Sequence, residues 1–546
     1  MSCARVHYLK GFDAVGVVVV GLLSNVIILW GPSRAPVYVA GLVLTCLLPG
    51  YLLTRTMLSA DEGIDQVERV VLAGGMGFAV LVVITLGLHF IPGPLNVKLV
   101  LVAFDGLLLL LGAVLAGQRR LASPSDVGRT ATVAPASRYG LFILLVLVLS
   151  AAFFRLANLG YSEFQGDEAR AMLMAAGVIR GEEQILFLHR KGPVEILMPA
   201  AFYALGGTTD ELVARLPFAV ASLGGILCVY CLVKRLFPHR EIAAPMAAGL
   251  LAVDGYLIAF GRIVQYQSVV FLMMALAVWC AYVWYSSGKS VLLWLTAAFL
   301  AVGTLAHYET VVVAPVLIWL FCSRACREGW PLRRWIRRAL GPGLLAVVVV
   351  GAFYVPFVCH PRFIPTAQYL TGERLGTAGL YNNLGDFFWR ATFYNSTYYI
   401  AFLCVGLVAL VIRELSSSLP PVLAVLIMVT TLVGLALSAV SPSALTAGNL
   451  DLAILPAALS MAVLIGAPRV AREEKVAFLW FAVPSLIALF LTRKPKNHVY
   501  LMFPAWAVLV GVATDRFVVA VRGRAARLRW ARYLWHPGVA FGCGML

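Results

Sequence analysis

The chain has 546 residues, of which 61% are hydrophobic and only 13% are charged, and its mean hydropathy is +0.89. These values exclude an ordinary soluble globular protein and indicate a membrane protein with many spans. The formal net charge of +17 does not require a nucleic-acid partner, because lysine and arginine accumulate in the cytoplasmic loops of membrane proteins.

Apolar runs long enough to cross about 30 Å of hydrocarbon follow one another along the whole chain. Their lengths fit helices and not the short alternating strands of an outer-membrane barrel. We therefore predict an all-α polytopic membrane protein with about sixteen transmembrane helices, four of them before a polar linker and about twelve after it. The predicted spans are 13–32, 36–53, 70–91, 98–117, 139–157, 212–233, 242–260, 268–286, 290–306, 310–323, 340–358, 398–412, 420–440, 451–468, 476–492 and 499–519.

The same pattern divides the chain into four parts. Residues 1–117 are predicted to form a four-helix N-terminal membrane domain of unknown role, and residues 118–138 a cytoplasmic linker rich in serine, proline, threonine and arginine. Residues 139–519 form a larger membrane domain, and residues 520–546 form a basic cytoplasmic tail.

Counting through the spans places the strongest basic clusters on one side of the membrane. These clusters are Arg119 with Arg120, Lys234 to Arg240, Arg324 to Arg338, Arg469 to Lys475 and Arg516 to Arg532. The positive-inside bias assigns that side to the cytoplasm, together with both termini. The loops at 158–211, 262, 362–394 and 493–500 then face the extracytoplasmic side of a plasma or inner membrane.

The loop at 158–211 is the most informative stretch of the chain because it carries dense charge beside apolar spans. It contains two candidate juxtamembrane helices: 167–179, with acids at its N-terminus, and 194–205, which is apolar and too short to span. Asp167 and Glu168 are adjacent and diverge by about 100° on a helix, so one of them should carry the chemistry. Arg170 shares the face of Asp167 and offers a fork to a phosphate, which favours transfer from a phosphate leaving group. A solvated charged face is the ordinary alternative.

Three further groups of residues on the outer side are candidates for function. The run RKPKNHVY supplies Lys494, Lys496, His498 and Tyr500, against the positive-inside bias, and favours binding of an anionic lipid head group; snorkelling to headgroup phosphates is the alternative. Arg262 follows Asp254 by eight residues, so a structural pair on one helical face is expected.

His307 and Glu309 offer two metal ligands, which together with Asp167 suggest a divalent cation, although a hydrogen-bonded structural histidine is the default interpretation. Asn395-Ser-Thr fits the pattern of a glycosylation acceptor. The chain has no GKS or GKT loop, no GxSxG and no HExxH, which disfavours ATP-driven transport and ordinary serine or zinc hydrolysis.

Several short motifs occur in an order that resembles a known family. These motifs are GDEAR, RKGPVEILMPAAFYALGG, ELVARLPFAVASLGG, FGRIVQYQS, LAHYE and KNHVYLMFP. The segment of about residues 139–519 resembles the GT-C membrane glycosyltransferases of the protein O-mannosyltransferase and lipid A aminoarabinose transferase type. The resemblance implies transfer of a sugar from a polyprenyl-phosphate donor to a hydroxyl or phosphate of a lipid, glycan or protein acceptor, on the extracytoplasmic face and with inversion.

The resemblance also implies roles for individual residues. The catalytic acid would be Asp167, with Glu168 beside it. The donor phosphate or its lipid would contact Arg170, Lys191, Arg262, Lys494, Lys496, His498 and Tyr500. Related sequences often carry acids where this chain has Arg190 and the run 265–267, so dependence on a metal at His307 and Glu309 stays open.

The alternative function is a transporter or flippase of an anionic polyprenyl-phosphate lipid. Paired halves are common in transporters, but the chain contains no second copy of GDEAR or KGP.

Overall fold

The computed structural model describes residues 13–31, 33–58, 63–121, 138–376, 379–447 and 450–525. Apart from a two-residue strand pair, β1 (Thr446–Ala447) with β2 (Leu450–Asp451), the regular elements of these residues are helical, which confirms the all-α prediction. Among the described residues, 11 helices are long and apolar enough to cross a membrane, or up to 12 if one bent pair counts as a span. Shorter apolar helices occupy the other predicted spans, so a count of about sixteen is consistent with the structure.

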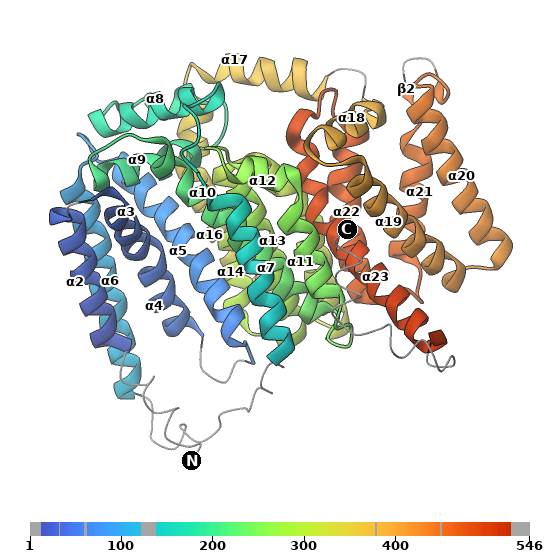
Figure 1. Ribbon diagram of the computed structural model, residues 1–546, viewed down its shortest axis with the longest axis horizontal. Helices are drawn as coiled ribbons and strands as arrows, with labels where there is room; N and C mark the ends of the chain where they lie inside the picture. Colours follow the sequence, from blue (N-terminus) through green and yellow to red (C-terminus); the bar gives the residue numbers. More distant parts are fainter. Residues whose placement is uncertain are drawn as a thin grey trace.

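The N-terminal part forms four upright helices (Figure 1). The second is continuous through a π-helical turn, because α3, η1 and α4 follow one another without a break. At the start of α5, Asp65 and Glu68 form a reciprocal capping box that satisfies two of the helix's free N–H groups. The helices are α2 (Asp13–Trp30), α3 (Arg34–Leu42), η1 (Val43–Leu47), α4 (Leu48–Met57), α5 (Gln66–His89) and α6 (Val97–Leu121).

The predicted linker is described only at its edges, because residues 122–137 lie outside the described residues, as do residues 526–546 of the tail.

The larger membrane part begins after the linker. Its first upright helices are α7 (Arg138–Leu156), α10 (Glu211–Leu236), α11 (Ala243–Val253), α12 (Gly255–Gly261), α13 (Gln267–Ser287), α14 (Ser290–Ala306), η4 (Tyr308–Val313), α15 (Ala314–Arg327) and α16 (Leu332–Cys359). Its last are α19 (Thr397–Ser418), α20 (Pro421–Val440), α21 (Ile454–Gly466), α22 (Arg472–Leu486), η6 (Ile487–Leu491), η7 (Lys496–Met502) and α23 (Phe503–Ala525).

Short helices lie across one end of these spans, at the top of Figure 1. They are α8 (Asp167–Arg180), η3 (Ile185–Leu188), α9 (Val194–Gly206), α17 (Phe363–Gln368), η5 (Tyr369–Leu375) and α18 (Leu384–Tyr394). Two of them, α8 and α9, match the predicted helices 167–179 and 194–205. The segment 158–211 therefore forms a cap over the end of the bundle.

The basic clusters meet at the other end of the spans. Glu474 pairs with both Arg240 and Arg516. The ends of α10, α22 and α23 that point away from the cap therefore lie together. Arg472 donates to the hydroxyl of Tyr285 at 2.7 Å, which adds the end of α13. The separation of basic clusters from the Asp167 loop follows the predicted span parity.

The N-terminal helices pack closely against the cap. An added Cβ at Gly206 would lie 2.2 Å from the ring of Tyr38, and one at Gly41 would lie 3.2 Å from Leu205. Almost all of α9 is buried, because α3, α5 and α6 cover one side and α8 and α10 the other. The predicted short apolar helix is therefore present as α9, and its apolar surface contacts protein.

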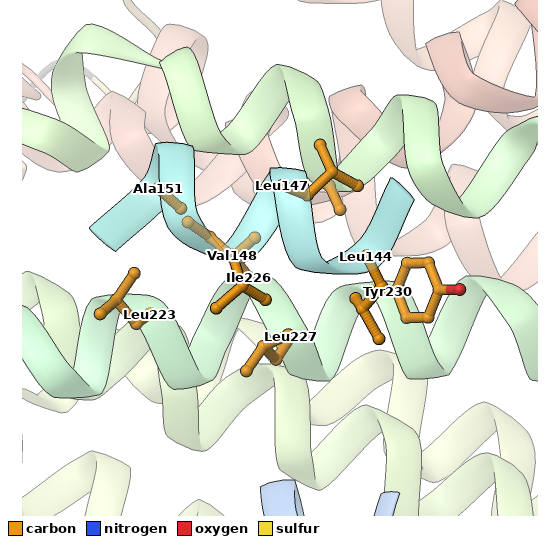
Figure 2. A pocket seen from close by; sticks show the side chains of 9 residues that line it. Leu144, Leu147, Val148, Ala151, Leu223, Ile226, Leu227 and Tyr230 are labelled. Carbon is orange, nitrogen blue, oxygen red and sulfur yellow. The ribbon is translucent and has the colours of Figure 1, made fainter. Parts of the chain in front are cut away.

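A small gap between α7 and α10 has only hydrocarbon side chains and one tyrosine around it (Figure 2). It is lined by Leu144, Leu147, Val148, Ala151, Leu223, Ile226, Leu227, Tyr230 and Ala248. No charged group lines it, so it is a packing defect between spans and not a candidate site.

Candidate active site

A buried ion pair fixes the start of α8. Arg215, on α10, binds the carboxylate of Glu168 through two bonds, from Nε to Oε1 and from Nη2 to Oε2, each 2.9 Å long. The other N–H groups of Arg215 donate to the carbonyls of Leu159, Ser162 and Glu163, and the N–H of Val264 donates to Glu168 Oε1 at 2.8 Å. Both side chains are buried.

This environment assigns Glu168 a structural role. Every hydrogen-bonding position of the pair is used by protein groups, so Glu168 is closed to a substrate and instead fixes the turn that presents Asp167. The sequence prediction that Glu168 shares the catalytic position with Asp167 does not fit this burial. Arg215 was missed as a site residue, although it stands in the ARLP motif.

Asp167 lies on the accessible side of the same turn. Its side chain is 68% exposed, and its Oδ2 is 3.3 Å from the ammonium of Lys191. Arg170, one turn further along α8, is exposed, and its side chain makes no hydrogen bond or ion pair with the described residues. The acid and the free guanidinium therefore both face the solution on the capped end.

Lys191 is the centre of a second set of contacts. Besides Asp167, its ammonium donates to Gln265 Oε1 at 3.1 Å and to both carboxylate oxygens of Glu195 at 3.4 Å. The same ammonium lies 5.1 Å from the ring centre of Tyr266, a favourable cation–π distance. Because Lys191 is only 21% exposed, these partners hold its charge at one place beside Asp167.

Glu195 holds the Lys191 ammonium from the buried side of the site. It is fully buried, contacts His189 Nε2 at 2.8 Å, and accepts the N–H of Tyr266 at 2.8 Å. Burial raises the pKa of the Glu195 carboxyl, but Lys191, His189 and the Tyr266 N–H together outweigh burial, and the pKa lies below its ordinary value. The sequence signal was its position four residues after Lys191 at the start of a helix, which sequence reasoning overlooked.

His307, Glu309 and His498 form a metal-ligand cluster next to Lys191. One ligand atom from each lies within 4.8 Å of the others, and Tyr500 donates to Glu309 Oε1 at 2.5 Å. Glu309 Oε2 is hydrogen-bonded to His498 Nδ1 and lies 3.6 Å from His307 Nδ1. Two imidazoles and one carboxylate are a donor set that fits a divalent cation.

The third candidate ligand differs from the expectation. Asp167 was the expected ligand beside His307 and Glu309, whereas His498 occupies that place and Asp167 pairs with Lys191. Tyr266 joins the two clusters, because its ring stacks on His307 with centres 4.0 Å apart. The acid, the lysine and the metal-ligand cluster thus belong to one continuous site.

The other predicted phosphate ligands have different positions. Arg262 donates to the carbonyls of Phe154, Ala157 and Asn158, so it caps the end of α7 and is not free for a phosphate. The expected pair with Asp254 is also absent, because Asp254 instead caps α12 by accepting from Leu257 N at 2.9 Å. This cap lies at a 58° bend between α11 and α12 that breaks the common helical face.

The segment formed by α17 and η5 contacts the loop at residues 493–500. Lys494 pairs with Glu373 at 2.7 Å, and Arg374 donates to the Lys494 carbonyl at 3.0 Å. Lys496 is exposed, whereas His498 and Tyr500 are committed to Glu309. Of the four predicted residues in this loop, the two lysines remain accessible to an anion.

Asn395 does not fit its glycosylation pattern. The side chain is 8% exposed, and its Oδ1 accepts the N–H of Gly255 at 2.6 Å. A glycan cannot be attached to an amide that is enclosed in this way without unfolding the contact.

Residues 190–353 match the family model of dolichyl-phosphate-mannose-protein mannosyltransferase, and residues 18–135 match a domain of unknown function. The first match confirms, over that segment, the resemblance to the GT-C membrane glycosyltransferases. Two crystal structures of ArnT from Cupriavidus metallidurans are similar to the chain, one in the apo state (16% identity, TM-score 0.38) and one bound to undecaprenyl phosphate (18% identity, TM-score 0.39). They cover 71% and 72% of this chain, which spans 62% and 64% of theirs. No curated protein matches the chain.

Proposed function

We propose that this multi-pass membrane protein is a glycosyltransferase that moves a sugar from a polyprenyl-phosphate donor to an acceptor. The observation that carries the proposal is the pair of accessible Asp167 and anchored Lys191, 3.3 Å apart on the capped end of the bundle. The family match supports the donor class, because its members are described as using a dolichyl-phosphate sugar. The basic clusters at the opposite end support an extracytoplasmic site through the positive-inside bias.

In the proposed reaction Asp167 is the general base. An acceptor hydroxyl gives its proton to Asp167 and attacks the anomeric carbon, a new C–O bond forms, and the bond between that carbon and the phosphate oxygen breaks. Attack from the face opposite the leaving phosphate inverts the sugar configuration. The product phosphate leaves with the polyprenyl chain.

Lys191 and Arg170 are proposed to bind the donor phosphate. Charge grows on this phosphate as the bond breaks, and fixed cations stabilise it in the transition state more than in the ground state. Glu195 and Gln265 hold the Lys191 ammonium while a phosphate replaces Asp167 as its third partner. Donor binding would in this way release the Asp167 carboxylate to accept a proton. Lys494 and Lys496 are proposed to contact the phosphate or lipid from the side opposite Lys191 and Arg170.

A divalent cation would be held by His307, Glu309 and His498. When bound, it would supply positive charge beside the donor phosphate. Without a cation, the Glu309 carboxylate is hydrogen-bonded to Tyr500 and His498.

The test is release of polyprenyl phosphate by the purified protein in lipid nanodiscs. A panel of labelled polyprenyl-phosphate sugars is supplied with lipid, glycan and peptide acceptors, and wild type is compared with Asp167→Asn and with Glu163→Gln. Glu163 is an exposed acid in the same loop and serves as the matched control. We expect turnover of one donor that Asp167→Asn abolishes and Glu163→Gln retains. Full activity of Asp167→Asn would refute the proposal, and donor movement between leaflets without cleavage would favour the flippase alternative.

A further inference from the structure

A groove opens at the end of the molecule opposite Asp167, between the first turns of α14 and α16. It has a volume of about 270 Å³ and is lined by Ser290, Leu293, Trp294, Arg337, Arg338, Gly341 and Pro342. The glycine helps to keep this space open, because a Cβ at position 341 would lie 2.7 Å from the indole of Trp294. The groove is separate from the candidate active site, because Trp294 precedes His307 by 13 residues, about 20 Å along a helix at 1.5 Å per residue.

The groove carries positive charge without an acid in its lining. Arg338 is hydrogen-bonded to the hydroxyl of Ser290. The side chain of Arg337 makes no hydrogen bond or ion pair with any residue in the described part of the chain. The acid of the preceding loop, Glu328, is already paired with Arg324 and Arg334. Two guanidinium groups therefore face an opening that no carboxylate neutralises, which favours an anion.

The side chains around the groove place it at the membrane surface. On α16, Leu332, Ile336 and Leu340 are exposed by 73%, 55% and 65%, next to the arginines of the same turns. Apolar side chains exposed beside arginines are typical of a helix that enters the headgroup region. Trp294 adds an indole, which prefers the same depth in a bilayer.

We propose that this groove binds the headgroup phosphate of an anionic glycerophospholipid from the leaflet opposite the candidate active site. The guanidinium groups of Arg337 and Arg338 hold the phosphate oxygens, and the Ser290 hydroxyl lies beside them. Trp294 and Leu293 cover the glycerol and the first methylenes of the chains. This binding site is independent of the proposed transferase activity.

The test is native mass spectrometry of the purified full chain in detergent, titrated with phosphatidylglycerol or with phosphatidylcholine. Wild type is compared with the double variant Arg337→Gln/Arg338→Gln and with Gly341→Ala, which keeps the charge but fills the groove. Arg469→Gln is the matched control, because Arg469 is an exposed arginine near the same end of the spans. Size-exclusion profiles establish that each variant is folded.

We expect the double variant to bind phosphatidylglycerol about twenty-five-fold more weakly, since each arginine near an anionic surface contributes about a five-fold factor. Gly341→Ala should also weaken binding, whereas Arg469→Gln should not, and phosphatidylcholine should bind weakly to every variant. Unchanged phosphatidylglycerol affinity in the double variant would overturn the proposal. Equal weakening by Arg469→Gln, or unchanged binding by Gly341→Ala, would also overturn it. Complete competition by millimolar inorganic phosphate would overturn it too, because it would indicate a site for free phosphate.

Discussion

The adjacent acids Asp167 and Glu168 should respond to neutralisation in opposite ways. Glu168→Gln removes one charge from a buried, bidentate pair and leaves the Arg215 guanidinium enclosed without a counter-ion. Breaking such a pair costs about 3–5 kcal/mol. Asp167→Asn removes an exposed carboxylate, so the folded state should lose little stability. Its loss as general base should lower the transfer rate by about 10²–10⁴-fold.

The stability change can be converted into a melting temperature. An unfolding entropy of about 2.1 cal/mol/K per residue over 546 residues gives roughly 1.1 kcal/mol/K. A loss of about 3–5 kcal/mol then lowers the melting temperature of Glu168→Gln by about 3–4 °C, with Asp167→Asn within about 1 °C of wild type.

The assay combines thermal unfolding in detergent with donor turnover in nanodiscs below the lower melting temperature. Glu168→Gln should keep measurable turnover per folded molecule, while Asp167→Asn should lose it. The reasoning would be refuted if Glu168→Gln melted like wild type and abolished turnover, because Glu168 would then act in the chemistry and not in the fold.

Three further predictions concern the surroundings of the site. Because the folded-state pKa of Glu195 is lowered, its ionised form stabilises the fold at neutral pH, and this contribution is lost as the pH falls below about 4.5. The melting temperature of Glu195→Gln should therefore fall less with acid than that of wild type. Parallel pH profiles of the two proteins would contradict this. Protein equilibrated with Zn²⁺ and gel-filtered should retain about one ion per chain by elemental analysis, and Glu309→Gln should retain none; equal retention would place the metal elsewhere. Gly206→Ala places a methyl group against the ring of Tyr38, so it should lower the free energy of unfolding by about 1–3 kcal/mol and also lower turnover. Gly87→Ala has open space at its Cβ and should change neither quantity. Identical melting of the two variants would show that the contact is unimportant.

The sequence was sufficient for the positions of the spans because apolar length is a local property. Each predicted run corresponds to one helix or to consecutive helices, including 290–306 and 451–468, whose helices are shorter than a full span. Lys191 was named as a site residue only through the family resemblance, and its ammonium lies 3.3 Å from Asp167.

The sequence could not provide partners that are distant along the chain. Glu309 and His498 are 189 residues apart, and Arg215 and Glu168 are 47 residues apart, so no periodicity relates them. The Arg262 prediction failed for a different reason. It assumed one straight helix from Asp254 to Arg262, but the chain bends by 58° after Val253 and sends the two side chains to different partners.

The N-terminal helices gain a physical role from the way they hold the cap. Their α5–α6 loop lies against the end of α8, since an added Cβ at Gly181 would be 2.7 Å from the backbone of Gly93. His89 contacts the carbonyl of Glu183 at 3.2 Å, and Tyr38 is hydrogen-bonded to Thr208 after α9. These contacts lie on both sides of Lys191 along the chain, and at the end of the helix that begins with Asp167. We therefore infer that this domain sets the distance between acid and lysine, and that substitutions within it change turnover without contacting a substrate.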